Sequence, residues 1–200
     1  ATLSYQGNLN FNGSDTLVVL STDSNALTDS DSVAITVTSV NDGPVNTVPG
    51  AQAVNEDTAL SISGVSVNDV DSNLSTTRLT VTNGAVTVSL AGGAAIGAGA
   101  NGSSTLTLSG TQAQINAALA SLSYQGNADF NGGDTLTVLS TDSSGATDSD
   151  AVAITVTSVN DGPVNTVPGA QTVNEDTLLS IGGISVNDVD GNLSTTQLSV

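Results

Sequence analysis

Hydrophobic and polar residues alternate in short runs along most of the chain, which is the period of β-strands. The clearest runs are Val33 to Val40 and Val152 to Val159. Leu79 to Leu90 is predicted to form two further strands joined at Asn83-Gly84, a dipeptide that favours tight hairpin turns. The other runs that predict strands are residues 1–10, 16–21, 58–62, 65–67, 105–108 and 135–139. The pattern therefore predicts an all-β fold of many short strands.

Polar and glycine-rich segments separate these strands. Residues 11–15 are predicted to form a turn, residues 22–32 an acidic loop, and residues 68–71 an acidic turn. Residues 91–102 are almost all glycine and alanine and predict a loop with little to pack. On this assignment every acidic residue lies in a loop or junction and none in a strand.

One segment, Thr111 to Leu122, has helical rather than strand-like spacing. Its apolar residues Ile115, Ala118, Leu119 and Leu122 fall on one face of a helix. Thr111 and Gln114 have the spacing of a capping box, which marks a helix start. We expect one short helix here, covering an open edge or end of a β-sandwich.

The sequence contains a long internal repeat. Residues 1–81 align with residues 120–200 without a gap, and only 16 of the 81 pairs differ. A fixed period of this kind indicates a tandem array. We expect residues 1–44 to be the C-terminal part of one repeat, 45–163 a complete repeat of 119 residues, and 164–200 the N-terminal part of the next, in a parent chain that extends both ways. About seven short strands per repeat predict a two-sheet Ig-like sandwich with one short helix.

Two identical stretches mark the boundaries between the predicted repeats. Thr38 to Gln52 recurs unchanged as Thr157 to Gln171, and the two copies contain all four prolines of the chain. Proline removes a backbone donor and fixes φ, so strands tend to end at such positions. Both stretches are therefore predicted to be interdomain junctions.

The composition excludes several classes of function. The chain has nineteen acidic residues, one basic residue (Arg78) and no histidine, so its formal net charge is −18 and it repels nucleic acid and anionic membranes. There is no cysteine for disulfides, and no membrane-inserting segment is expected here. Without histidine, cysteine or lysine nothing activates a serine or threonine nucleophile, so we expect no enzyme.

The acidic residues suggest calcium, which binds six to eight oxygen ligands in irregular geometry. In an Ig-like strand order, the turn at residues 68–71 and the loop at residues 142–150 lie at the N-terminal end of the complete repeat, where Glu56 and the linker join them. The alternative is that these are ordinary solvated loop acids. The predicted ligands are Asn41, Asp42, Glu56, Asp69, Asp71 and Asp142 at the first junction; Asn160, Asp161, Glu175, Asp188 and Asp190 at the second; and Asp23 at a junction upstream of residue 1.

Several of these motifs carry a resemblance to a known family. Val-Asn-Asp-Gly-Pro at residues 40–44 resembles the cadherin linker, Glu56 the glutamate of the first cadherin strand, and residues 68–71 the Asp-x-Asp motif. Ser-Thr-Asp-Ser around Asp142 resembles the end of the penultimate strand. The whole period is similar to the cadherin-like repeats of giant bacterial surface adhesins. Asp15 and Asp134 lie in about the loop of the Asp-Arg-Glu motif, which has no good match, and are the remaining candidate ligands.

The resemblance implies a non-enzymatic stalk of a secreted, cell-surface adhesin, stiffened by Ca²⁺ at the junctions between neighbouring repeats of the same chain. Two alternatives remain open. The chain could be a subunit of a self-assembling fibre or sheath, with other copies as partners, or a ligand-binding Ig-like adhesion module. Lateral contacts between chains would distinguish the fibre, and specific end loops the ligand-binding module.

Overall fold

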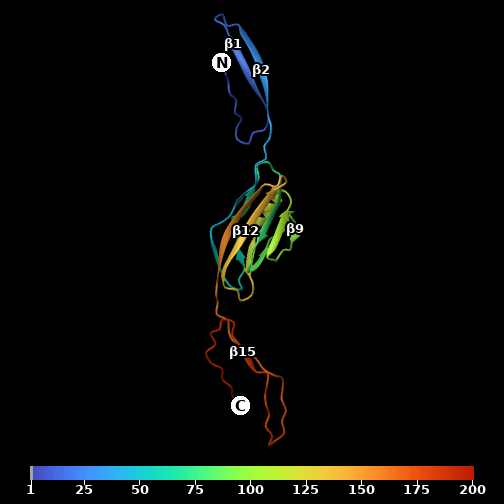
Figure 1. Cartoon of the computed structure of the whole chain (residues 1–200), viewed down its shortest axis with the longest axis vertical. Helices are drawn as coiled ribbons and strands as arrows, with labels where there is room; N and C mark the ends of the chain where they lie inside the picture. The colour runs from blue at the N-terminus through green and yellow to red at the C-terminus, as the bar shows by residue number, and fades with distance from the viewer. Residues whose placement is uncertain (1) are drawn as a thin grey trace.

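The computed structural model describes residues 2–200 as an elongated molecule, in which three parts follow one another along the long axis (Figure 1). A β-hairpin near the N-terminus is followed by a compact central unit and then by an open C-terminal part with two short strands. Within the described residues, the buried hydrophobic cluster extends from Ile62 to Val156, so the core belongs to the central unit.

The protein is all-β with one short helix, which confirms the class expected from the hydrophobic pattern. The strands are β1 (Gly13–Thr22), β2 (Thr28–Val37), β3 (Val45–Thr47), β4 (Gln52–Asn55), β5 (Leu60–Ser61), β6 (Ser66–Asn68), β7 (Leu74–Thr80), β8 (Gly84–Thr87), β9 (Ala95–Gly99), β10 (Thr105–Ser109), β11 (Ser123–Gly126), β12 (Gly132–Asp142), β13 (Thr147–Thr157), β14 (Val164–Thr166) and β15 (Ser185–Asn187). The helix is α1 (Gln112–Leu119).

The central unit is built on a six-stranded sheet of order β4-β13-β12-β7-β10-β9, a three-stranded sheet of order β5-β11-β8, and the pair β3-β6. All pairings are antiparallel except that of β4 with β13, which is parallel. Alternate residues of β12 are buried, among them Leu136 and Val138, and they share the core with Tyr124 of β11. The arrangement is compatible with a β-rich Ig-like fold.

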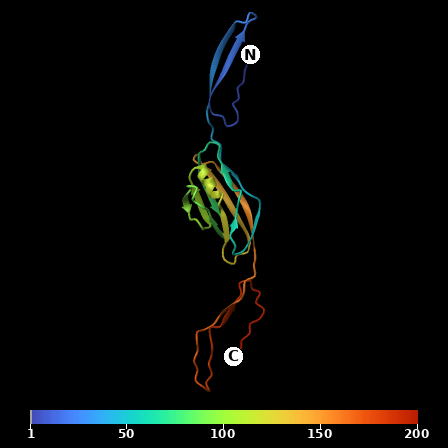
Figure 2. The same ribbon diagram turned by 180° about the vertical axis from the view of Figure 1, so that it is seen from behind.

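Helix α1 confirms the helical pattern, and it lies in the part of the central unit nearer the N-terminal hairpin (Figure 2). The Thr111 hydroxyl accepts from the Gln114 backbone N–H at 3.3 Å, and the Gln114 side chain accepts from the Thr111 N–H at 2.8 Å, so the capping box is complete. Ile115, Ala118 and Leu119 are fully buried. The Asn116 amide accepts from Val67 N–H and donates to Val67 C=O, which joins the helix to β6.

The hairpin predicted within residues 79–90 is wrong. β7 belongs to the six-stranded sheet and β8 pairs with β11 in the three-stranded sheet, so the Asn83-Gly84 segment crosses between sheets. A Cβ at Gly84 would lie 2.4 Å from the Gln125 carbonyl oxygen, which shows how closely the two backbones approach there. The glycine is needed for this approach rather than for a tight turn.

The loop predicted for residues 91–102 is also wrong, because it contains β9. This strand pairs with β10 at the edge of the six-stranded sheet, and all its residues are exposed. Glycine and alanine lower β-propensity, but the pairing uses backbone groups, which every residue has. Composition alone therefore hid an edge strand.

The acidic loop predicted for residues 22–32 is shorter than expected. β2 begins at Thr28 and β13 at Thr147, so that Asp29 and Asp148 lie inside strands, together with Asp31, Asp150, Asp15 and Asp134. The expectation that no acid lies in a strand is therefore wrong. Asp148 has a structural contact there, because its carboxylate accepts from the Asn46 N–H at 2.6 Å and fixes β3 beside β13.

The two copies of the repeated sequence form the same local pairings. β1 pairs with β2 from Gly13 opposite Val37, and β12 pairs with β13 from Gly132 opposite Val156. β14 and β15 likewise reproduce the register of β3 and β6. The strand predicted for residues 1–10 is not formed within the described residues 2–10. Its counterpart β11 is held between β5 and β8, and no described strand takes those two places beside residues 2–10.

Candidate metal centre

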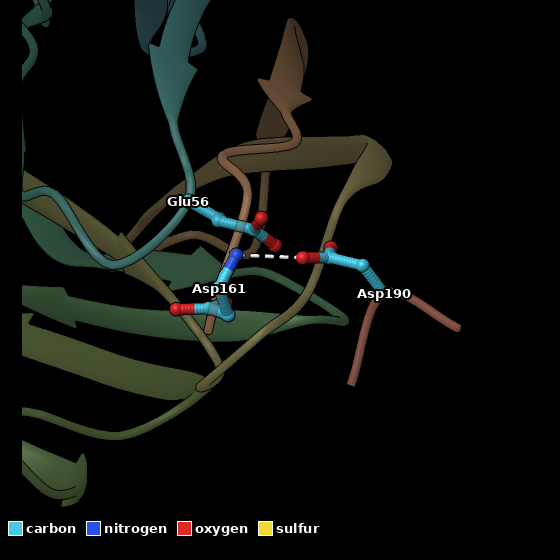
Figure 3. A group of neighbouring side chains, drawn as sticks. All are labelled: Glu56, Asp161 and Asp190. Carbon is cyan, nitrogen blue, oxygen red and sulfur yellow. Dashed lines mark hydrogen bonds between the residues drawn. The ribbon is translucent and has the colours of Figure 1, made fainter. Parts of the chain in front are cut away.

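Three carboxylates converge at the second junction, where the chain leaves the central unit after β13. Glu56, Asp161 and Asp190 each offer an oxygen, and these oxygens lie within 4.8 Å of one another (Figure 3). They come from the segment after β4, from the linker, and from the turn after β15. The Asp161 backbone N–H donates to the Asp190 carboxylate at 2.6 Å, which ties the linker to the C-terminal part.

A second group of carboxylates shares Asp161 with the first. Asp57, Asp129 and Asp161 also offer oxygens within 4.8 Å of one another. Asp129 lies in the turn before β12, and its N–H donates to the Asp57 carboxylate at 3.3 Å. Five carboxylates from four segments of the chain therefore surround the start of the second linker.

The pairing of β4 with β13 explains why Glu56 belongs to this junction. Asn55 lies opposite Thr157 in the parallel register, and the Glu56 N–H donates to the Thr157 carbonyl at 2.9 Å. The buried Glu56 carboxylate then accepts from the Val159 N–H at 2.6 Å. The sequence grouping of Glu56 with Asn41 and Asp42 is wrong, because β4 runs beside β13 toward the opposite end of the central unit.

The other five residues predicted for the first junction are linked there by hydrogen bonds, but their carboxylates form no group of three within 4.8 Å in residues 2–200. The Asn41 amide donates to the Asp142 carboxylate at 2.7 Å, and the Asp42 N–H donates to the Asp71 carboxylate at 2.6 Å. Asp69 accepts from the Asp71 N–H at 3.0 Å. The second junction repeats the last two contacts in the pairs Asp161–Asp190 and Asp190–Asp188.

Two asparagines that the sequence analysis did not select complete this pattern. The Asn73 amide lies 2.6 Å from the Asn41 side-chain oxygen, and with its amide flipped it donates to the Asp69 carboxylate at 2.9 Å. The Asn192 amide donates to the Asn160 side-chain oxygen at 2.7 Å. Each follows the Asp-x-Asp turn by two residues and recurs at the 119-residue spacing. That recurrence was the signal available in the sequence.

The N-terminal part also contributes to the first junction. A polar cavity of about 480 Å³ is lined by Asn10, Asn12, Asn41, Asp71 and Asn73, among others. Asn10 and Asn12 correspond to Asp129 and Asn131, 119 residues later. The loop before β1 thus faces the first junction, as the loop before β12 faces the second. Since Asn10 replaces an aspartate, the first junction has one carboxylate fewer at this place.

The pKa of Asp161 at the second junction and the pKa of Asp142 at the first are shifted in opposite directions. Burial, followed by repulsion from Asp129, Asp190, Asp57 and Glu56, raises the pKa of Asp161 above its ordinary value. At the first junction the Asn41 amide and the N–H groups of Ala146 and Ser144 lower the pKa of Asp142, against an opposing effect of burial. Asp161 therefore lacks compensation for its charge, whereas the charge of Asp142 is stabilised by protein donors.

Glu175 and Asp23 lie apart from both groups of carboxylates. Glu175 is exposed, in a turn in which the Thr177 N–H donates to the Asn174 carbonyl at 3.3 Å. Asp23 accepts from the N–H groups of Asn25 at 2.8 Å and Leu27 at 2.9 Å. Asp142 has the same turn geometry, with Ser144 and Ala146 as donors at 2.9 and 2.8 Å. The assignment of Asp23 to an upstream junction stays a prediction.

Asp134 and Asp15 each accept hydrogen bonds from protein donors that hold the carboxylate in place. Asp134 is buried and accepts from the N–H groups of Thr82, Asn83 and Thr135 at 2.7–3.0 Å, and from the Tyr124 hydroxyl at 3.0 Å. Burial raises the pKa of Asp134, but these donors outweigh it and the net shift is downward. Asp15 repeats the tyrosine contact with Tyr5, at 2.8 Å. Protein donors thus already hold both carboxylates, which belong to neither acidic group.

The donor set at the junctions consists of carboxylate and amide oxygens, which suits a hard cation such as Ca²⁺. The chain has no histidine or cysteine, the usual nitrogen and sulfur ligands of zinc and copper. The residues that would hold the ion at the second junction are Glu56, Asp57, Asp129, Asp161 and Asp190. Its chemistry would be electrostatic, since it would join like charges that otherwise repel one another.

The fold and these clusters define an all-β protein with one helix and acidic junctions. Residues 57–151, just under half of the chain, match the family model described as the Protein GAMETE EXPRESSED 2 domain. The match runs from the residue after Glu56 into β13, and so includes most of the core and α1 but neither linker. This is a eukaryotic family, so the assignment to bacterial cadherin-like repeats is wrong. Two of the motifs that suggested it, residues 40–44 and Glu56, lie outside the matched region, whereas residues 68–71 and the motif around Asp142 lie inside it.

A search among curated proteins gave no match. In residues 2–200 the structure contains no helix that is long and apolar enough to cross a membrane.

Proposed function

We propose that the protein is a non-enzymatic spacer of an extracellular or cell-surface protein, in which Ca²⁺ bound at the junctions holds successive units in line. The observation that carries the proposal is the convergence of five carboxylates on the second linker. They form two groups of three that share Asp161, and within each group the offered oxygens lie within 4.8 Å of one another. Burial, and after it repulsion from four neighbouring carboxylates, raises the pKa of Asp161, and the repulsion is what a bound divalent cation would relieve.

The proposal includes the repeat architecture: residues 1–44, 45–163 and 164–200 are parts of successive Ig-like units with a period of 119 residues. The matching registers of β1–β2 and β12–β13 support it. So do the contacts of Asp42 with Asp71 and of Asp161 with Asp190, which have the same length of 2.6 Å. Near-identical units suit a spacer better than a specific binding tip, which is the reason for preferring a spacer to a ligand-binding module.

The mechanism is electrostatic. Without a cation, several negative charges face one another across a linker of a few residues, and the two units can separate to reduce their repulsion. An ion bound to the linker and to both flanking units would remove this repulsion and join all three segments. Extracellular modules bind calcium with Kd values of about 0.1–1 mM, so such sites fill outside a cell and empty inside it. The stiffness of the chain would then depend on whether the protein has been exported from the cell.

The test is isothermal titration of the 200-residue chain with Ca²⁺, compared with Asp161→Asn. Asp161 is chosen because it belongs to both groups of carboxylates. We expect binding in the range of about 0.1–1 mM for the unmodified chain, and loss of the second-junction component in the variant.

Asp29→Asn is the matched control, because Asp29 is an exposed carboxylate in β2 and belongs to neither group. This variant makes the same change in net charge and should bind Ca²⁺ as the unmodified chain does. Equal losses in both variants would indicate nonspecific attraction to a negative surface. That result, or no binding to the unmodified chain, would contradict the proposal.

A further inference from the structure

Four asparagines of the chain are followed directly by glycine: Asn12, Asn83, Asn101 and Asn131. An asparagine in this position can react with its own backbone, because the nitrogen of the next residue can attack the side-chain amide carbon. Glycine has no side chain to obstruct that attack, and its backbone rotates freely. The structure distinguishes these sites by how firmly the fold holds each one.

Asn101 is held by both polar atoms of its side chain. Its oxygen accepts from the Val88 N–H at 2.9 Å, and its nitrogen donates to the Val88 carbonyl at 2.8 Å. The N–H of the following Gly102 donates to the Val86 carbonyl at 2.9 Å. The amide carbon and the attacking nitrogen are therefore both fixed, and a ring between them can close only if these hydrogen bonds break.

Asn83 is held through its backbone and by close packing. Its N–H donates to the Asp134 carboxylate at 2.9 Å, and its carbonyl accepts from the Asn127 N–H at 2.9 Å. Gly84 lies so close to β11 that an added Cβ would be 2.4 Å from the Gln125 carbonyl oxygen. The backbone at Gly84 therefore has little room to rotate toward the Asn83 side chain.

Asn131 is exposed and directly precedes β12, beside the second junction. Its amide nitrogen makes a long contact of 3.5 Å with the Glu56 carboxylate. Gly132 is also exposed, and an added Cβ there would have its nearest neighbour, the Phe130 ring, at 3.7 Å. Gly132 is the first residue of β12, and the ends of strands open more readily than their interiors. This Asn-Gly pair thus has the freedom to rotate that Asn83 and Asn101 lack.

We propose that Asn131 is a modification site, at which spontaneous deamidation converts a neutral amide into a carboxylate beside Glu56. The Gly132 nitrogen loses its proton to solvent base and attacks the side-chain amide carbon of Asn131. Ammonia leaves, and a cyclic succinimide forms. Water then opens the ring at either of its carbonyl carbons, which gives an aspartate or an isoaspartate. Water is the only co-reactant, and ammonia is the only product released.

The new carboxylate would join the acidic residues of the second junction. The Asn131 amide faces the Glu56 carboxylate as a donor, and a negative oxygen would take its place, so the repulsion there would increase. Because the number of ligand charges tunes the affinity of calcium sites, the reaction should strengthen cation binding at this junction. This effect on calcium rests on the proposed function, whereas the reaction itself does not.

Asn12 is the counterpart of Asn131 at the 119-residue spacing. It lines the polar cavity at the first junction together with Asn41 and Asp71. The same reaction at Asn12 would add a carboxylate to that junction.

The first test follows the reaction in the 200-residue chain, incubated in EDTA at mildly alkaline pH and analysed by peptide mapping with mass spectrometry. At Asn131 we expect isoaspartate and a mass increase of about 1 Da, formed at least about ten times faster than at Asn83 or Asn101. In urea the three sites should react at similar rates, since each is followed by glycine and the fold no longer holds it. An unreacted Asn131, or equal rates at the three sites in the folded chain, would overturn the proposal.

The second test measures the effect on calcium by isothermal titration. Asn131→Asp reproduces the aspartate product and should tighten Ca²⁺ binding at the second junction by about two- to tenfold. Asn25→Asp makes the same chemical change in the exposed turn between β1 and β2, and it should leave that affinity unchanged. Equal effects of the two variants would contradict a local effect at Asn131. If no variant binds Ca²⁺, the proposed function fails, but the mass measurement still decides whether the modification occurs.

Discussion

At the scale of single residues, Asp134 shows how a carboxylate can be required for the fold without binding a ligand. Three backbone N–H groups and the Tyr124 hydroxyl point at it from three different segments. Those donors include the backbone of Thr82 and Asn83, where the chain crosses from one sheet to the other. The carboxylate therefore fixes the crossing that brings β8 beside β11.

The lowered pKa of Asp134 gives a prediction with a definite sign. A carboxyl whose folded pKa lies below its unfolded value of about 3.9 stabilises the fold above that value, and its contribution is lost as pH falls through the folded pKa. Asp134→Asn should lower the free energy of unfolding by about 1–3 kcal/mol at pH 7, and the difference from the unmodified chain should shrink below about pH 4. Urea unfolding followed by circular dichroism measures this. Asp31→Asn, an exposed residue of β2, should show no such difference.

Sequence reasoning assigned five of the six residues predicted for the first junction to the place where the structure has them, but it put the sixth, Glu56, at the wrong junction. The residues placed correctly lie in turns and in the linker, and such segments lie near the end of a unit. They are Asn41, Asp42, Asp69, Asp71 and Asp142. Glu56 was assigned to the wrong end, since the direction of β4 depends on its parallel pairing with β13. The four-residue sequence of β4 does not indicate that β13 is the strand with which it pairs.

At the scale of elements, α1 is the segment in which local sequence and tertiary packing agree most closely. Its cap and its buried face follow from the spacing of apolar residues and from Thr111 and Gln114, although it ends at Leu119 and not at the predicted Leu122. β9 is the opposite case. Its glycine and alanine residues offer no apolar face, and it forms because β10 presents free backbone groups at the sheet edge.

The helix prediction can be tested by placing a charge on each of its two faces. Ile115→Asp should unfold the central unit or lower its free energy of unfolding by about 3–5 kcal/mol, because the carboxylate would be buried without a partner. Ala113→Asp puts the same charge on the exposed face, at the second residue of the helix, and should change the free energy of unfolding by no more than about 0.5 kcal/mol. Thermal unfolding by calorimetry distinguishes the two. Equal melting temperatures would show that the packing of Ile115 contributes nothing to the core.

At the scale of the whole molecule, the buried core extends from Ile62 to Val156, and the four prolines lie outside it at residues 44, 49, 163 and 168. The two acidic junctions differ in which of their parts are present. In residues 2–200 the Asp142 turn lies at the first junction, whereas Glu56 and Asp57 lie at the second. The two junctions together therefore contain all the residue types of the proposed cation site.

The dependence of molecular length on calcium tests the spacer as a whole. Small-angle scattering at a concentration where the chain is monomeric should give a larger maximum dimension in Ca²⁺ than in EDTA, because bound ions would hold the units in line. Asp69→Asn/Asp71→Asn removes two carboxylates from the first junction only, so in Ca²⁺ this variant should be shorter than the unmodified chain but keep its β-sheet circular dichroism. The second junction retains its ligands, so the shortening should be partial. Equal dimensions of the unmodified chain with and without calcium would contradict a cation-controlled spacer, whatever the affinity measured by titration.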